Sequence, residues 1–141
     1  LEFDWTGTDD YSAFLVIPQC LEFLASLYPG GIPEHMRRNH EKAVWAMQYL
    51  CSEFDAEAPC PEDMLGSMAS VPCLPPLENP VISSGRVLDP VQERLFHDYR
   101  VEVPIVNWPM SGHRLVRVSA QAYNTEEDYH RLASALKQIL S

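Results

Sequence analysis

The sequence predicts an α+β fold, a small antiparallel sheet with helices packed on one of its faces. Two short segments, residues 101–107 and 114–120, have the composition of β-strands, and the turn signal Met110-Ser111-Gly112 between them indicates a hairpin. Much of the remaining chain places apolar residues at helical spacing. The chain has 141 residues, of which 46% are hydrophobic, so it can bury one real core. A single domain plus part of another fits this length.

Two helices are expected in the N-terminal third. Asp10 can cap the first, which runs to about Tyr28, and Pro18 either kinks it or begins a new first turn. Pro29-Gly30-Gly31 ends this helix, and Pro33 opens a longer one. The first helix carries Phe14, Ile17, Leu21, Leu24 and Leu27 on one face, and the second carries Met36, His40, Ala43, Val44, Met47, Leu50 and Cys51 at helical spacing.

The middle of the chain is less regular. Residues 52–63 are acidic and contain prolines, which indicates a loop or a short edge element. Residues 64–71 have the composition of a strand. Residues 74–85 are rich in proline and predict an irregular connection between the two halves of the chain.

Two more helices are expected in the C-terminal half. Asp89 is a capping carboxylate, Pro90 takes the first helical position, and Gln92 stands where a capping box needs it. The last helix is expected to be capped by Asn124, with acidic residues 126–128 at its positive end. Its buried face is expected to hold Tyr129, Leu132, Ala133, Leu136 and Leu140.

The strand over residues 114–120 holds the main candidate for a binding residue. Alternation places Val116, Val118 and Ala120 on one face, and Leu115, Arg117, Ser119 and Gln121 on the other. The first face is expected to be core, with the Asp89 helix and the last helix packed on it. The second presents a guanidinium flanked by small and polar groups, and this group can bind a carboxylate through two parallel hydrogen bonds. A surface arginine on an exposed sheet is the alternative.

Charge and composition exclude several functions. The net charge of -10 argues against nucleic acid or an anionic membrane as a partner, because phosphate binding requires clustered Lys and Arg. No apolar run is long enough to span a bilayer. The N-terminus begins at Leu1 without a Met or a basic region, so we expect a cut inside a longer protein rather than a signal peptide.

Neither the cysteines nor the histidines form a metal-binding pattern. Cys20, Cys51, Cys60 and Cys73 have no C-x-x-C spacing, and no histidine pair stands near them at zinc distance. Cys20 and Cys51 lie in helical apolar patterns, where a buried free thiol is expected, whereas Cys60 stands between prolines in an acidic loop. These features predict a reduced, cytoplasmic protein without a bound metal.

Two segments resemble one enzyme family. The run Arg-x-Ser-x-x-x-Tyr-Asn-Thr over residues 117–125, followed by an acidic turn and Leu132, resembles the C-terminal end of class V aminotransferase-type enzymes, which are fold-type-I proteins dependent on pyridoxal phosphate. Residues 5–10, Trp-Thr-Gly-Thr-Asp-Asp, are similar to a second segment of that family. The resemblance covers most of the chain, with residues 54–80 matching loosely, and the nearest subgroup is that of isopenicillin N epimerase-like proteins.

The resemblance implies the C-terminal small domain of such an enzyme. Residues 1–28 would end the large domain, and residues 29–141 would form the small domain. Pyridoxal phosphate requires a lysine for its Schiff base. Lys42 and Lys137 are expected on exposed helix faces, so the resemblance places the cofactor lysine upstream of Leu1. The chain alone is therefore expected to bind no cofactor and to be inactive.

The resemblance also implies two sets of site residues. Arg117 would bind the α-carboxylate of an amino-acid substrate, and Gly7 and Thr8 would contact the cofactor phosphate of the opposite subunit in a homodimer. Residues 101–116 contain no cysteine, so a persulfide-forming desulfurase is not expected. Epimerase, aminotransferase and carbon–sulfur lyase activities stay open. A non-catalytic α+β interaction module, binding a partner on its exposed sheet face, is the competing hypothesis.

Overall fold

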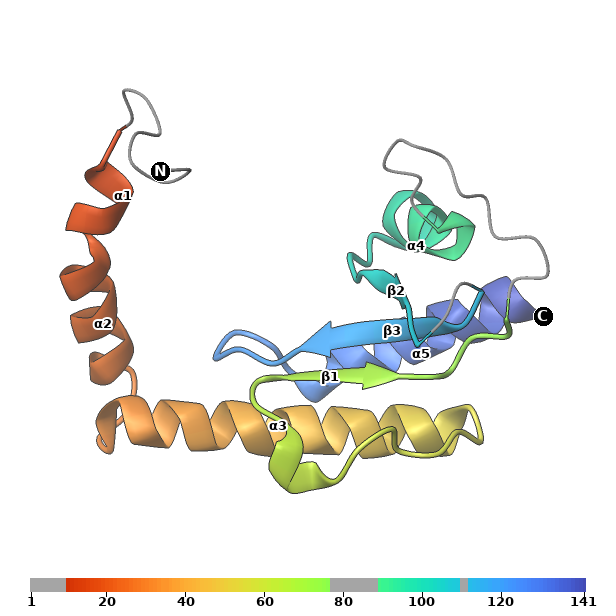
Figure 1. The fold of residues 1–141 in the computed structure, drawn as a ribbon, viewed down its shortest axis with the longest axis horizontal. Coiled ribbons are helices and arrows are strands. Elements are labelled where there is room, and N and C mark those ends of the chain that lie inside the picture. The colour runs from red at the N-terminus through yellow and green to blue at the C-terminus, as the bar shows by residue number, and fades with distance from the viewer. Residues whose placement is uncertain (1–9, 77–88, 110–111) are drawn as a thin grey trace, which may run out of the picture. The chain divides into compact units, whose positions relative to one another are not determined.

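The computed structural model describes residues 10–76, 89–109 and 112–141, and it confirms the α+β class (Figure 1). The chain divides into two compact units, residues 1–37 and residues 38–141, which are taken separately below. The domain boundary that the resemblance implies, between residues 28 and 29, stays a prediction.

The described residues of the first unit, 10–37, are mostly helical. Its helices are α1 (Ser12–Leu15), α2 (Ile17–Ser26) and the first turns of α3 (Gly31–Glu53). The predicted helix from Asp10 breaks at Val16, and Pro18 lies in the first turn of α2, so the second of the two predicted roles for this proline is confirmed. Gly31 has φ +65°, a left-handed conformation that costs glycine little, and α3 begins there rather than at Pro33.

Neither α1 nor α2 contains a buried residue. Cys20 is therefore exposed, and the expectation of a buried thiol at this position is wrong. The apolar face predicted from the spacing exists in sequence, but among the described residues it is not buried.

The second unit is built on a three-stranded antiparallel sheet in the order β1-β3-β2. Its strands are β1 (Met68–Val71), β2 (Ile105–Asn107) and β3 (Arg114–Ser119), and the hairpin between β2 and β3 is confirmed. Both outer strands are shorter than predicted. A 3-10 turn, Glu62–Met64, precedes β1, and the amide of Val101 donates to Leu95 at 2.9 Å, so this part of the predicted strand closes a helix instead.

Helices α4 (Pro90–Tyr99) and α5 (Glu126–Leu140) complete this unit. Asp89 caps α4 as predicted, accepting from the amide of Val91 at 2.8 Å. The predicted cap of α5 is wrong by one residue: Thr125 is the N-cap, and its amide donates to the Asp128 carboxylate at 2.9 Å. Asn124 instead accepts from the amide of Gln121 at 3.0 Å, which closes the turn that leads into the helix.

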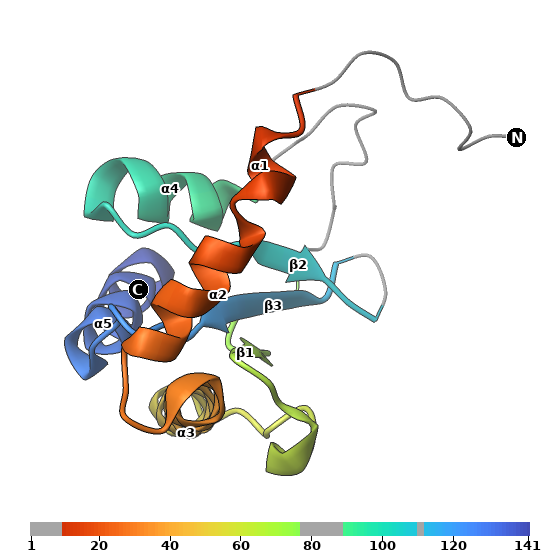
Figure 2. The ribbon, with the colours of Figure 1, turned by 90° about the vertical axis from the view of Figure 1, so that its left-hand side faces the viewer.

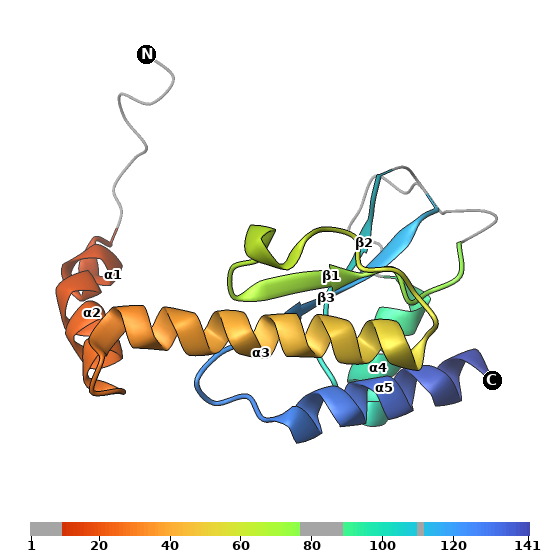
Figure 3. The ribbon, with the colours of Figure 1, turned by 90° about the horizontal axis from the view of Figure 1, so that it is seen from below.

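The core lies on one side of this sheet. Figures 2 and 3 show α4, α5 and the second-unit part of α3 on the same face of the sheet, and no α-helix among the described residues of this unit covers the opposite face. The expected packing of α4 and α5 on the Val116 and Val118 face is confirmed, and α3 joins them. The buried cluster consists of Ala46, Met47, Leu50 and Cys51 from α3, Ala69 and Val71 from β1, Val116 and Val118 from β3, Val91 and Leu95 from α4, and Tyr129, Leu132, Ala133, Ala135 and Leu136 from α5, with Cys73 and Leu74.

Candidate functional site at the outer face of the sheet

Arg117 lies on the uncovered face of the central strand. Along β3 the side chains of Arg114, Val116 and Val118 are buried, whereas those of Arg117 and Ser119 are exposed, so the predicted alternation is confirmed. The backbone of Arg117 is held on both sides, because it pairs with Ser70 of β1 and its amide donates to the Pro104 carbonyl at 3.0 Å. Within the described part of the chain, no hydrogen bond or ion pair engages its guanidinium group.

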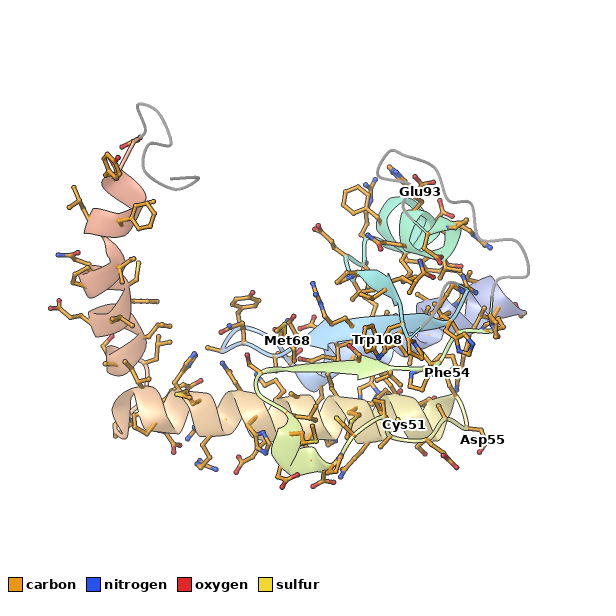
Figure 4. All side chains as sticks on the ribbon, viewed as in Figure 1. Cys51, Phe54, Asp55, Met68, Glu93 and Trp108 are labelled. Atoms are coloured by element: carbon orange, nitrogen blue, oxygen red, sulfur yellow. The ribbon has the colours of Figure 1, made fainter. Side chains whose placement is uncertain are left out.

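Two hollows meet at Arg117. The first, a cavity of about 330 Å³, is lined by residues 100–104, by Arg117, Val118 and Ser119, and by Tyr123, Asn124, Asp128, Tyr129, Arg131 and Leu132. The second, of about 430 Å³, is more apolar and lies over the outer sheet face, where Pro59, Cys60, Leu65, Met68, Ala69, Ser70, Val106, Trp108 and Leu115 surround it with Arg117. Figure 4 labels Met68 and Trp108, which approach this face from β1 and from the end of β2.

The turn after β3 is fixed from α3. The Lys42 ammonium group donates to the carbonyl oxygens of Gln121 and Asn124, at 2.8 and 2.5 Å, and the Asn39 amide donates to the Gln121 side chain at 3.4 Å. The prediction that Lys42 lies on an exposed helix face is wrong: its side chain is half-buried and bound at its tip. Lys137 is half-exposed, as predicted, and pairs with Glu53.

The end of β3 is also tied to α5. The hydroxyl of Tyr129 donates to the carbonyl of Ser119 at 2.9 Å. Burial raises the pKa of Tyr129 to about 12, so the phenol keeps the proton that it donates. The exposed strand segment that presents Arg117 is therefore anchored to a helix that is itself part of the core.

A buried ion pair, which the sequence analysis does not predict, lies on the inner face of β3. The Arg114 guanidinium contacts both carboxylate oxygens of Asp89, at 3.1 and 3.2 Å, and its Nε donates to the Pro75 carbonyl at 2.9 Å. The two charged side chains are 5% and 6% exposed. The available signal was the alternation itself, which places Arg114 on the same face as Val116.

The cysteines differ in environment and are all free thiols. Cys73 is buried, and burial raises its pKa to about 12, which keeps it protonated and unreactive. Cys51 is also buried, as predicted, and its pKa is raised for the same reason. Cys60 is half-buried on the wall of the apolar hollow beside Arg117.

The other predicted site residues, Gly7 and Thr8, lie outside the described residues, so their role stays a prediction. Across residues 10–76, 89–109 and 112–141, no group of three His, Cys, Asp or Glu side chains is arranged to hold a metal ion. In the same ranges no single helix is both long and apolar enough to cross a membrane. One bent pair, residues 12–26 with residues 31–53, is long and apolar enough by length and composition only.

The fold and this site define a small α+β domain that presents an arginine on an open sheet face. Comparison with known proteins gives its relatives. Over 99% of its length the chain is 37% identical to a probable chloroplastic L-cysteine desulfhydrase of Arabidopsis thaliana, and likewise over 99% it is 30% identical to an L-cysteine desulfhydrase of the same plant. It is 30% identical, over 94% of its length, to an isopenicillin N epimerase of Amycolatopsis lactamdurans. No family model matches the chain.

Over nearly its whole length the chain is thus similar to L-cysteine desulfhydrases and isopenicillin N epimerases, which is consistent with a C-terminal fragment of a class V aminotransferase-type enzyme. It covers 30% of the chloroplastic desulfhydrase and 30% of the epimerase, so it spans about a third of the length of the curated relatives that it matches. The chloroplastic relative leaves the predicted cytoplasmic location without support from the comparisons.

Proposed function

We propose that this chain is the C-terminal small domain of a pyridoxal-phosphate-dependent enzyme acting on an amino acid, and that Arg117 binds the substrate's α-carboxylate. The observation that supports this role most directly is an exposed guanidinium, without a partner among the described residues, on a strand whose backbone is paired on both sides. A plain surface arginine would be exposed in the same way, so the substitution of Arg117 described below is the test that separates the two roles.

The geometry suits carboxylate binding for a physical reason. A guanidinium presents two parallel N–H groups that match the two oxygens of a carboxylate. A side chain that starts from a paired strand loses less freedom on binding than one that starts from a loop. Fixing the carboxylate also fixes the orientation of the bonds at the substrate Cα, and this orientation determines which bond can react.

The cofactor would be held mainly by residues outside this chain. When bound, pyridoxal phosphate supplies an electron sink for charge that develops at the substrate Cα. Both lysines of the chain already have partners. Lys42 donates to two backbone carbonyls and Lys137 pairs with a carboxylate, so the cofactor lysine is assigned to another part of the protein. Gly7 and Thr8 would contribute to the phosphate site of the opposite subunit, which requires a homodimer.

Carbon–sulfur bond cleavage is the first reaction to assay. The chloroplastic desulfhydrase shares more of its residues with this chain than the epimerase does. Residues 101–116 hold no cysteine, so a mechanism through an enzyme persulfide is not proposed. Epimerisation is the second reaction to assay, because an epimerase is among the relatives.

The substitution Arg117→Lys in the full-length protein tests the carboxylate role. Lysine keeps the charge but loses the paired N–H groups, so amino-acid affinity is expected to fall about tenfold or more. Cofactor content and thermal stability are expected to stay unchanged. The measurement is a substrate titration followed by the cofactor's absorbance, with Arg94→Lys, on the exposed side of α4, as the matched control. Normal substrate affinity, or loss of folding, would contradict the role.

A non-catalytic interaction module is the second candidate, and the exposed apolar side chains around the outer sheet face favour it. Met68 is 50% exposed and Trp108 is 65% exposed. Such side chains on an open face are typical of a protein contact. Failure of the full-length protein to bind pyridoxal phosphate would favour this candidate over the enzyme.

A further inference from the structure

The cavity of about 330 Å³ beside Arg117 is lined by two more arginines, Arg100 and Arg131. We propose that this cavity binds a second anionic group of the ligand, so that the preferred substrate class is amino acids with an acidic side chain or tail. This inference rests on the proposed function, in which Arg117 takes the α-carboxylate. It adds a specificity site to that function.

The guanidinium of Arg131 is bound to the backbone beside Arg100, and both residues line the cavity. Arg100 ends α4 in a left-handed conformation, with φ +57°. Arg131 of α5 donates from one terminal nitrogen to the carbonyl of Tyr99, the residue next to Arg100, at 2.6 Å. A guanidinium has five N–H donors, so this bond leaves Arg131 with donors for a ligand.

The charge balance of the cavity wall favours an anion. Three arginines face two carboxylates, those of Glu102 and Asp128. The Asp128 carboxylate is already occupied by the Thr125 amide at 2.9 Å. The wall therefore carries a net positive charge in a chain whose net charge is -10, and an anion would be attracted to this position more than to the surrounding surface.

The volume also suits a small ligand. Pockets that hold small molecules begin at roughly 300 Å³, and this cavity of about 330 Å³ is at the small end of that range. Tyr123 and Asn124 add polar groups to the wall. A carboxylate at one end of a short aliphatic chain could bind Arg117, while a second carboxylate reaches Arg100 or Arg131.

Glutarate and pentanoate test this inference in the full-length protein by titration calorimetry. They share a five-carbon chain and differ by one carboxylate, and neither has an amine that could react with a cofactor. The wild type is expected to bind glutarate about tenfold more tightly than pentanoate, the size of one charge-assisted hydrogen bond. Arg100→Gln and Arg131→Gln should each reduce this ratio several-fold and leave pentanoate binding unchanged.

A gain of affinity provides the opposite test. Glu102→Gln removes a negative charge from the same wall, so it should raise the glutarate-to-pentanoate ratio. Arg94→Gln, which changes an arginine that does not line the cavity, is the control and should leave the ratio unchanged. Circular dichroism checks that each variant is folded.

The outcomes separate this inference from the proposed function. Equal binding of glutarate and pentanoate by the wild type would overturn the second anion site, as would a ratio that survives in the Arg100→Gln/Arg131→Gln double variant. Arg117→Lys should weaken both acids. If pentanoate binding is unaffected by Arg117→Lys while the ratio still depends on Arg100 and Arg131, the α-carboxylate role fails and the second anion site stands.

Discussion

Arg114 and Arg117 stand three residues apart on β3, and the two faces of the strand give them opposite environments. Arg114 points into the core, where Asp89 and the Pro75 carbonyl bind its guanidinium. Arg117 points outward, between two hollows, and among the described residues no group of the protein binds its guanidinium. The same residue type therefore stabilises the core on one face of the strand and is available to a ligand on the other face. The alternation of side chains along β3 decides which of the two arginines is buried.

The inner arginine should carry a large part of the stability. Arg114→Met leaves the Asp89 carboxylate buried without its partner, and breaking one side of a buried ion pair costs about 3–5 kcal/mol. The free energy of unfolding in urea measures this loss. An effect below about 1 kcal/mol would show that the pair is not formed in solution.

The buried groups on the inner face also predict a pH dependence. The pKa of Cys73 is raised to about 12 by burial, so the folded state holds this proton more tightly than the unfolded state. The contribution to stability is complete below about pH 9 and is lost as the pH rises towards 12. At pH 11, two pH units above the unfolded pKa, the loss is expected to be about 3 kcal/mol. Cys73→Ala should flatten this decline, leaving the parts due to Cys51 and Tyr129, whose pKa values burial also raises, and an unchanged slope would contradict the assignment.

Removing both charges should cost less than removing one. The double substitution Arg114→Met/Asp89→Asn leaves no buried charge, and the introduced asparagine can still cap α4 because asparagine caps as well as aspartate. We expect a loss of about 1–2 kcal/mol, smaller than that of Arg114→Met alone. Comparison of the two unfolding curves checks this, and a loss in the double variant as large as that of Arg114→Met or larger would contradict it.

Lys42 links the core helix α3 to the turn that follows the exposed arginine. Lys42→Met removes two hydrogen bonds from an ammonium group to the Gln121 and Asn124 carbonyls, and a loss of about 1–2 kcal/mol is expected because the site is only half-buried. Amide hydrogen exchange over residues 121–125 should accelerate. Lys137→Met, which removes a surface pair with Glu53, serves as the control with little effect.

Local patterns predicted the faces of the molecule well and its long-range pairs poorly. Alternation gave the outward direction of Arg117 and the inward direction of Val116 and Val118, because strand parity is a property of adjacent residues. The partners of Arg114 and Lys42 lie 25 and 79 or more positions away in sequence, where no periodicity connects them. Helical spacing alone therefore predicts an exposed Lys42, although its ammonium group is bound. The roles of Gly7 and Thr8 came from resemblance alone.

The smallest expected effect is that of Arg117→Met on stability. The guanidinium has no partner among the described residues and the side chain is exposed, so the change should fall within about 0.5 kcal/mol, the range of ordinary surface substitutions. The substitution is chemically identical to Arg114→Met, and only the face of the strand differs, so the pair isolates the effect of burial from that of residue type. Urea unfolding of both variants under one set of conditions makes the comparison. A loss at Arg117 that matches the loss at Arg114 would show that the outer arginine supports the fold, and its assignment to a ligand would then have to be abandoned.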